Sequence, residues 1–260
     1  MTAPEVPTAT LPGGGAMPLL GFGTWQMPGR ECYDAVRTAL DVGYRHLDTA
    51  TMYRNEAEVG RALRDSGVDR AEVFVTTKLP PREAGRAQQT LDTSRRALGV
   101  DAVDLWLVHW PPGGPGVDLW RRFLAAQDAG QARAVGVSNY SLDEIDTLTR
   151  QTGGTPAVDQ IRWAPSLYDP AVEDGLRERG VVLEGYSPFK STDLSDPVLR
   201  EVADAHGVTP SQVVLRWHLE HGVVVIPKSS HRERIVANAQ VTGFSLTPDE
   251  VARIDGLGGR

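Results

Sequence analysis

VFVTTKLPPREAGRAQQTLDTSRRALGVDAVDLWLVHW, residues 73–110, contains the structural unit that is repeated along this chain. Its two apolar runs, VFVTT and VDLWLV, show no alternation of polar and apolar residues, which is typical of strands buried on both faces of a parallel sheet. Between them, residues 87–99 form a helix-like segment that ends in glycine, as helices often do. The stretch therefore predicts a strand, a helix and a second, parallel strand.

The same alternation runs through the whole sequence. Strands are expected at residues 20–23, 45–48, 73–77, 103–108, 134–138, 157–160, 181–185 and 223–226. Eight strand-helix units in 260 residues predict a single domain, residues 1–260, with the α/β fold of a (β/α)₈ TIM barrel. ATLPGGGAMPLL, residues 9–20, predicts an N-terminal β-hairpin that closes the bottom of the barrel.

A doubly wound sheet is the alternative fold. It is disfavoured because GFGTWQMPG, residues 21–29, lacks the GxGxxG spacing and no GxxxxGK[ST] motif occurs in the chain. Two further helices are expected between the seventh and eighth strands, within residues 187–222.

Composition limits the class of protein. The chain is 40% hydrophobic, carries a net charge of −7 and has no long apolar run, so we expect neither a membrane nor a nucleic-acid partner. MTAPEVPTAT at the N-terminus lacks the pattern of a secretory signal, which predicts a cytoplasmic protein. The single cysteine, Cys32, excludes an intrachain disulfide and a cysteine-rich zinc site. We also expect a monomer.

The three lysines stand out, because the other 24 of the 27 basic side chains are arginine. An ammonium is compact and its pKa can be shifted, which is not true of a guanidinium. Lys78, Lys190 and Lys228 are therefore candidates for special roles, although Lys190 is expected to be a solvated lysine.

In a (β/α)₈ barrel, functional residues lie at the C-terminal ends of the strands. Polar residues occur there on seven successive strands: Asp48 with Tyr53, Lys78, His109, Ser138 with Asn139, Asp159 with Gln160, Tyr186 with Ser187, and Lys228 with Ser229 and Ser230. Each residue taken alone could serve as a turn cap, a core residue or a solvated side chain. Their coincidence at the same strand ends favours one shared site.

Asp48, Tyr53, Lys78 and His109 together suit proton donation to a carbonyl oxygen. A phenol with its reference pKa near 10 is a weak acid at neutral pH. An ammonium about 4 Å away would favour the phenolate by up to about 4 kcal/mol at an effective dielectric near 20. We expect Lys78 to supply this charge, Asp48 to hold the ammonium, and neutral His109 to orient the substrate oxygen or share in the proton transfer.

A basic group follows the eighth strand, in VVVIPKSSHRERIVAN (223–238). Lys228, Ser229, Arg232 and Arg234 lie at a predicted helix N-terminus, where free amides favour an anion. Tyr186 could stack on a flat ring, and Asn139 with Gln160 could bind an amide. These features predict a phosphorylated cofactor that contains a ring and extends toward Tyr53.

The sequence resembles the aldo-keto reductase family over nearly its whole length. The resemblance rests on the ordered series LGFGTWQ (20–26), GYRHLDTATMYRNE (43–56), VTTKL (75–79), DLWLVHWP (104–111), GVSNY (136–140), VDQI (158–161), YSP (186–188) and VVIPKSS with Arg234 and Asn238. It implies a (β/α)₈ barrel that reduces aldehydes or ketones with NADPH and without a metal. The family's catalytic residues correspond to Asp48, Tyr53, Lys78 and His109, with Tyr53 as proton donor.

The resemblance also implies which residues bind NADPH/NADP⁺ and the small-molecule carbonyl substrate. The cofactor residues are Gly23, Thr24, Ser138, Asn139, Gln160, Tyr186, Ser187, Pro188, Phe189, Lys228, Ser229, Ser230, Arg234 and Asn238. Among them Lys228, Ser229 and Arg234 match contacts to the 2′-phosphate, which favours NADPH over NADH. Trp25, Met52 and Trp110 are the expected substrate contacts.

Several positions depart from the common family pattern. Leu79, Pro80 and Pro81 replace an aromatic residue after Lys78, and RWAP replaces EYHP at residues 162–165. Asp159 replaces asparagine, Phe189 replaces leucine, and Ala237 replaces an acidic residue before Asn238, the residue that matches a contact to the adenine. PPGGPGVD (111–118) is a short loop, and the chain ends at DGLGGR. The expectation is an open pocket, similar to that of bacterial 2,5-diketo-gluconate reductase-like members.

Two other functions are compatible with the barrel. His46, Asp48 and His109 could in principle bind zinc in a metal-dependent hydrolase, but the chain has no HxH or HExxH motif. A non-catalytic NADPH-binding module is the other alternative, and the presence of all four catalytic residue types argues against it.

Overall fold

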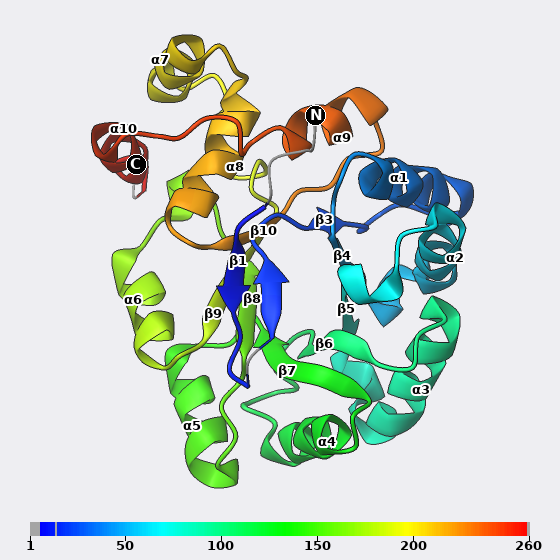
Figure 1. Cartoon of the computed structure of the whole chain (residues 1–260). Coiled ribbons are helices and arrows are strands. Elements are labelled where there is room, and N and C mark those ends of the chain that lie inside the picture. Colours follow the sequence, from blue (N-terminus) through cyan, green and yellow to red (C-terminus); the bar gives the residue numbers. More distant parts are fainter. Residues whose placement is uncertain (1–5, 14, 259–260) are drawn as a thin grey trace.

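The computed structural model describes residues 6–13 and 15–258. Eight strands form one parallel sheet in sequence order (Figure 1). They are β3 (Phe22–Gly23), β4 (His46–Asp48), β5 (Phe74–Leu79), β6 (Val103–Val108), β7 (Ala132–Ser138), β8 (Val158–Arg162), β9 (Val182–Tyr186) and β10 (Val224–Ile226). Each predicted strand is found, with ends that differ by up to two residues from those expected.

Hydrogen bonds between the first and last strands close the sheet. The Gly21 amide donates to the Val225 carbonyl at 2.9 Å, and the Val225 amide donates to the Leu19 carbonyl at 2.7 Å. The Gly23 amide donates to the Pro227 carbonyl at 3.0 Å. The predicted (β/α)₈ barrel is thereby confirmed.

Helices surround the barrel (Figure 1). They are α1 (Gly29–Asp41), α2 (Glu56–Ser66), α3 (Ala87–Leu98), α4 (Val117–Asp128), α5 (Leu142–Thr152), α6 (Pro170–Glu178), α7 (Pro197–His206), α8 (Pro210–Glu220), α9 (Arg232–Ala239) and α10 (Pro248–Asp255). In α3 the buried residues Ala87, Leu91, Ser94 and Leu98 recur at helical spacing, so one stripe packs on the sheet. In chain order, α7 and α8 both come after β9 and before β10, as predicted.

Local sequence sets the limits of these helices. In α5, Ser141 and Glu144 form a capping box, in which each side chain accepts a hydrogen bond from the other residue's backbone amide. Gly153 follows the helix with a φ of 77°, a left-handed conformation in which glycine avoids the strain of a side chain.

The N-terminal hairpin consists of β1 (Thr8–Thr10) and β2 (Ala16–Pro18), paired antiparallel. It lies across one end of the barrel (Figure 1), where the backbone of Pro18 interacts with His46, the first residue of β4. The hairpin therefore covers the end at which the strands begin, and the opposite end is left for the site. Part of its turn, Gly14, lies outside the described residues, as do residues 1–5 and 259–260 of the predicted domain.

Candidate active site

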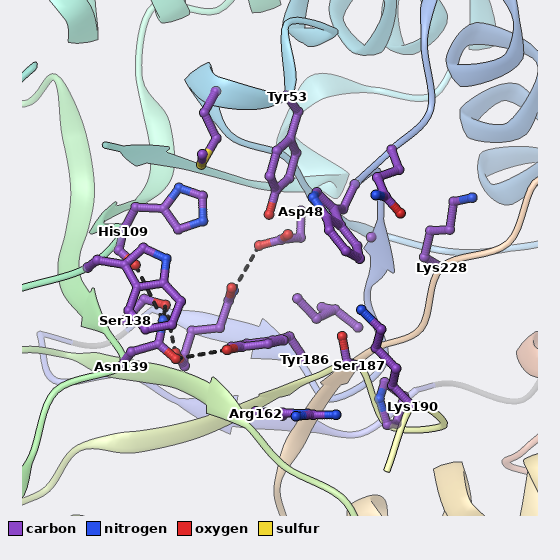
Figure 2. Close-up of a pocket in the computed structure, with 18 of the residues that line it drawn as sticks. Asp48, Tyr53, His109, Ser138, Asn139, Arg162, Tyr186, Ser187, Lys190 and Lys228 are labelled. Carbon is purple, nitrogen blue, oxygen red and sulfur yellow. Dashed lines mark hydrogen bonds between the residues drawn. The ribbon is translucent and has the colours of Figure 1, made fainter. Parts of the chain in front are cut away.

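A cavity of about 650 Å³ opens at the C-terminal ends of the barrel strands (Figure 2). The predicted residues that line it are Gly23, Trp25, Asp48, Met52, Tyr53, His109, Trp110, Ser138, Asn139, Gln160, Tyr186, Ser187, Pro188, Phe189 and Lys228. Lys78 is fully buried directly beneath the cavity and contacts Asp48. The barrel thus brings residues from all eight strands and the loops after them to one place.

Tyr53 is held by a short helical turn that follows β4. Residues Thr51–Tyr53 form this turn, and Arg54 ends it in the left-handed conformation with a φ of 59°. The buried Asn55 side chain then donates to the carbonyls of Thr24 and Met27, at 2.8 and 3.0 Å. These bonds tie the chain just after Tyr53 to the loop after β3, and β4 holds the chain before it.

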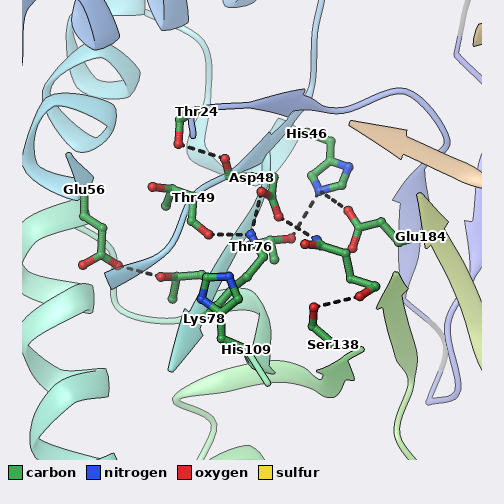
Figure 3. A network of polar contacts seen from close by, with 12 residues as sticks. Thr24, His46, Asp48, Thr49, Glu56, Thr76, Lys78, His109, Ser138 and Glu184 are labelled. Atoms are coloured by element: carbon green, nitrogen blue, oxygen red, sulfur yellow. Dashed lines mark hydrogen bonds and ion pairs between the residues drawn. The ribbon is translucent and has the colours of Figure 1, made fainter. Parts of the chain in front are cut away.

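Asp48 and Lys78 form a buried ion pair (Figure 3). The Lys78 Nζ lies 2.6 Å from Asp48 Oδ1 and also donates to the Thr49 carbonyl at 2.9 Å. The second oxygen, Asp48 Oδ2, accepts a 2.9 Å hydrogen bond from Gln160 Nε2. Burial lowers the pKa of Lys78, but the Asp48 and Tyr53 charges more than offset it, so the pKa is raised overall. Lys78 therefore remains a cation.

Tyr53 points its hydroxyl toward this pair (Figure 2), and Lys78 Nζ lies 5.2 Å from the centre of the phenol ring. Burial raises the pKa of Tyr53 and is the largest effect; the Lys78 charge lowers it, although not enough to cancel burial. The expected effect of the Lys78 charge on Tyr53 is thus present in direction, but burial opposes it. Lys78 makes the phenol more acidic than burial alone would leave it.

His109 lies beside Tyr53, with ring centres 5.8 Å apart in an edge-to-face arrangement. Burial lowers the pKa of His109 to about 3, and the Lys78 charge acts in the same direction. The imidazole is therefore neutral at physiological pH. A neutral imidazole carries one N–H donor, which suits it to orient a carbonyl oxygen without adding charge.

Side chains that can bind an amide form a connected group on the opposite wall (Figure 2). Ser138 Oγ donates to the Gln160 carbonyl at 2.7 Å, and Asn139 Nδ2 donates to Ser138 Oγ at 2.9 Å. The Tyr186 hydroxyl donates to Asn139 Oδ1 at 2.9 Å. Gln160 is shared between this group and Asp48, so a ligand amide here would lie next to the buried ion pair.

Backbone strain is concentrated around the cavity. Among the described residues, four that are not glycine have a positive φ: Gln26, Arg54, Asn139 and Ser187. Three of them line the cavity and Arg54 follows Tyr53. Such conformations are costly and persist where surrounding contacts enforce them, often at functional sites.

The rim of the cavity is aromatic and partly exposed. Trp25, Met52 and Trp110 are 41%, 40% and 47% exposed. The ammonium of Lys190, in the loop after β9, lies 4.7 Å from the centre of the Trp25 ring. Lys190 is exposed, as expected of a solvated lysine, and it also lines the cavity.

Five predicted cofactor residues do not line this cavity. Thr24 is buried, and its hydroxyl donates to the Asp48 carbonyl at 3.0 Å, which ties two strand ends together. Ser229 and Ser230 precede α9, and Arg234 and Asn238 lie within it. Among the described residues, neither Lys228 nor Arg234 forms an ion pair, and both are exposed at this end of the barrel.

Sequence reasoning did not select several residues that shape the site. Gln26, Arg162 and Ile226 also line the cavity, and Arg162 is the exposed last residue of β8. Arg162 had a signal in the sequence, because it belongs to the RWAP departure at residues 162–165. The others had none, since neither an isolated glutamine in a loop nor an isoleucine at the end of an apolar strand is distinctive.

Within residues 6–13 and 15–258, no three His, Cys, Asp or Glu side chains are placed to hold a metal ion. No helix in the same ranges is long and apolar enough to cross a membrane.

Comparisons with known proteins agree with one another. The model of the Aldo/keto reductase family matches residues 19–258. The 2,5-diketo-D-gluconic acid reductase B of a Corynebacterium species is 44% identical over 260 residues, which cover 98% of this chain and 94% of that protein. The crystal structure of an aldo/keto reductase from Brucella melitensis superposes with a TM-score of 0.94 at 37% identity, covering 97% of this chain and all of that one. An aldo-keto reductase of Bombyx mori, solved in complex with NADP, gives a TM-score of 0.92 at 29% identity and covers 98% and 93% of the two chains.

Proposed function

Because the chain belongs to the aldo/keto reductase family, whose members are oxidoreductases acting on carbonyl compounds, we propose that it reduces aldehydes or ketones to alcohols with NADPH, and that Tyr53 donates the proton. One observation carries the assignment of Tyr53. Its phenol borders the cavity directly above a buried ammonium, Lys78, which Asp48 holds at 2.6 Å.

The residues of the cavity fit such a cofactor. Tyr186 offers a half-buried aromatic ring, and Ser138, Asn139 and Gln160 offer amide and hydroxyl groups beside it. Lys228 and Arg234 offer cations that no acidic side chain among the described residues neutralises. A nicotinamide amide would be held by the first group, and the phosphates would be attracted to the second.

When bound, NADPH supplies a hydride to the carbonyl carbon of the substrate. Tyr53 then protonates the oxygen, which becomes the alcohol hydroxyl. Lys78 favours this transfer because its positive charge stabilises the phenolate left behind. Asp48 fixes the position of the ammonium, and neutral His109 hydrogen-bonds the carbonyl oxygen so that it faces Tyr53.

The aromatic rim supports a small carbonyl compound as substrate. Trp25, Met52 and Trp110 present apolar surface at the entrance, whereas donors lie deeper, beside Tyr53. Such a gradient orients a substrate with its carbonyl group inward.

Replacement of Tyr53 by phenylalanine tests the proposal. Tyr53→Phe removes the hydroxyl but keeps the ring, so reduction of an aldehyde followed at the nicotinamide absorbance should fall by about 100-fold or more. Binding of NADPH, measured by fluorescence titration, should change little. A variant that keeps near-normal turnover would refute the role of Tyr53. NADPH binding by the parent chain without turnover of any aldehyde, ketone or dicarbonyl would instead indicate a non-catalytic binding module.

A further inference from the structure

Glu184 is a buried carboxyl group that has no part in the proposed mechanism. It lies in β9, pairs in register with Gln160 of β8 and Val224 of β10, and is 0% exposed (Figure 3). Neither of its carboxyl oxygens has a hydrogen-bond partner among the described residues. An ionised carboxylate in such a place would lack the donors that normally stabilise it.

The charged and titratable groups that face Glu184 come from two neighbouring strands. His46 and Asp48 belong to β4, and Lys78 belongs to β5. The facing residues of β8 and β10, Gln160 and Val224, carry no charge.

None of these groups compensates a charge on Glu184. His46 Nε2 lies 3.7 Å from Glu184 Oε1, too far for a hydrogen bond, and burial lowers the pKa of His46 to about 3. The imidazole is therefore uncharged. Lys78 is already paired with Asp48 at 2.6 Å. An ionised Glu184 would be a second buried anion beside a single cation, which is an unfavourable arrangement.

The protonation of Glu184 agrees with this geometry. Burial raises the pKa of Glu184 to about 8, and the nearby charge of Asp48 acts in the same direction. The Gln160 amide and the Lys78 charge lower this pKa but do not offset burial. The side chain is thus mainly a neutral carboxylic acid at pH 7, and it becomes a carboxylate only in alkaline solution.

We propose that Glu184 is a positioning residue that acts as an uncharged acid, so that β9 places no second carboxylate beside Asp48 and the Lys78 ammonium can stabilise the Tyr53 phenolate. Ionisation of Glu184, with release of its proton to solvent, offsets part of the Lys78 field. It therefore makes Tyr53 a weaker acid in alkaline solution. This role rests on the proposed function of Tyr53.

Kinetics of Glu184→Gln test the electrostatic role, because glutamine resembles the neutral acid but cannot ionise. Alcohol oxidation with NADP⁺ requires the Tyr53 phenolate, so it reports the acidity of Tyr53 directly. The apparent pKa of kcat/KM in this direction should be lower in the variant by about half a unit or more, because a nearby negative charge has been removed. The ratio of kcat/KM between variant and parent should therefore rise severalfold from pH 7 to pH 10. A ratio that stays constant or falls with pH overturns the proposal.

Thermal unfolding gives a readout that does not depend on activity. The pKa of Glu184 is about 8 in the folded chain against 4.5 as its reference value, so the folded state binds the extra proton between these pH values. The stability of the parent should then fall as pH rises from 4.5 to 8, whereas Glu184→Gln lacks this loss. The melting temperature of the variant relative to the parent should increase across this range.

Glu31→Gln is the matched control, because Glu31 is exposed on α1 and loses the same charge. Its melting temperature should follow that of the parent at every pH. The contrary result is a Glu184→Gln chain that is less stable than the parent at pH 7 and equally so at pH 8. Glu184 would then be an ionised partner of Lys78 or His46, and the proposal would be wrong. If Tyr53→Phe retains turnover while the melting curves behave as expected, the proposed function fails and the neutral state of Glu184 stands.

Discussion

Lys78 determines the electrostatics of the cavity at the scale of single residues. Its ammonium is fully buried, contacts Asp48, and influences the pKa of Tyr53, His109 and Glu184. Burial disfavours the charged form of each of these groups. A single cation paired with a single anion is therefore the charge arrangement with the lowest desolvation free energy. A lysine suits this role because its charge is compact and can be enclosed by Asp48 and one carbonyl.

Lys228 is the residue on which the proposed preference for NADPH can be tested. It is exposed and has no acidic partner among the described residues, so its charge is available to a phosphate. Lys228→Ala should weaken NADPH binding about tenfold or more, because charge-assisted hydrogen bonds contribute about 1.5–3 kcal/mol. Binding of NADH, which lacks the 2′-phosphate, should change by less than about twofold.

Fluorescence titration with both cofactors measures these constants. Lys228→Arg is the control, since it keeps the charge and should retain most of the NADPH affinity. Equal weakening of NADPH and NADH in Lys228→Ala would contradict contact with the 2′-phosphate.

At the scale of secondary structure, the C-terminal helix α10 is attached by histidine-carboxylate pairs. His221, which follows α8, lies 3.0 Å from Asp255 of α10 and 3.1 Å from Glu173 of α6. His206 of α7 lies 2.9 Å from Glu250 of α10. Burial lowers the pKa of His221, but its hydrogen bonds and charge interactions with Glu173 and Asp255 outweigh burial, so the pKa is raised.

This attachment should depend on pH. Because the folded-state pKa of His221 lies above its reference value of 6.5, the pair stabilises the fold fully below pH 6.5 and loses that contribution as pH rises through the folded-state pKa. His221→Asn should lower the free energy of unfolding by on the order of 1 kcal/mol at pH 6, or about 2–4 °C in melting temperature. The deficit should shrink at pH 9. A deficit that is the same at both pH values would show that packing, not charge, holds the helix.

At the scale of the whole molecule, closure of the barrel depends on Gly21. Its amide bonds the Val225 carbonyl, and a Cβ at this position would lie 2.5 Å from His46 Nδ1 and 2.8 Å from Ile226 Cγ2. The absence of a side chain therefore allows the first and last strands to meet around the His46 ring.

Gly21→Ala should strain this closure. Forcing a methyl group into a packed interior typically costs about 1–3 kcal/mol, so the denaturation midpoint in urea should fall with little change in slope. Gly85→Ala is the matched control, because a Cβ at Gly85 meets nothing within 4 Å. A Gly21→Ala chain as stable as the control would show that the barrel closes without this contact.

The barrel itself followed from short-range patterns. Apolar runs such as VDLWLV, and helices that end in glycine, predicted the strands and helices because burial on both faces leaves a periodic trace in the sequence. The polar residues at the strand ends predicted the site, because parallel strands in a barrel place their C-terminal ends together. Both inferences depend only on neighbours in the chain and on the geometry of a closed sheet.

The sequence by itself determined the architecture and placed Tyr53, Asp48, Lys78 and His109 at one end of it. Only the tertiary structure decided which groups meet, as when Gln160 donates to Asp48 across 112 residues of chain. It also decided that burial outweighs the effect of the Lys78 ammonium on the pKa of Tyr53, and that no described residue donates a hydrogen bond to the Glu184 carboxyl group. The physical reason is that hydrogen-bond partners and solvation depend on distances across the barrel, which strand register and closure set, whereas periodicity records only whether a residue is buried.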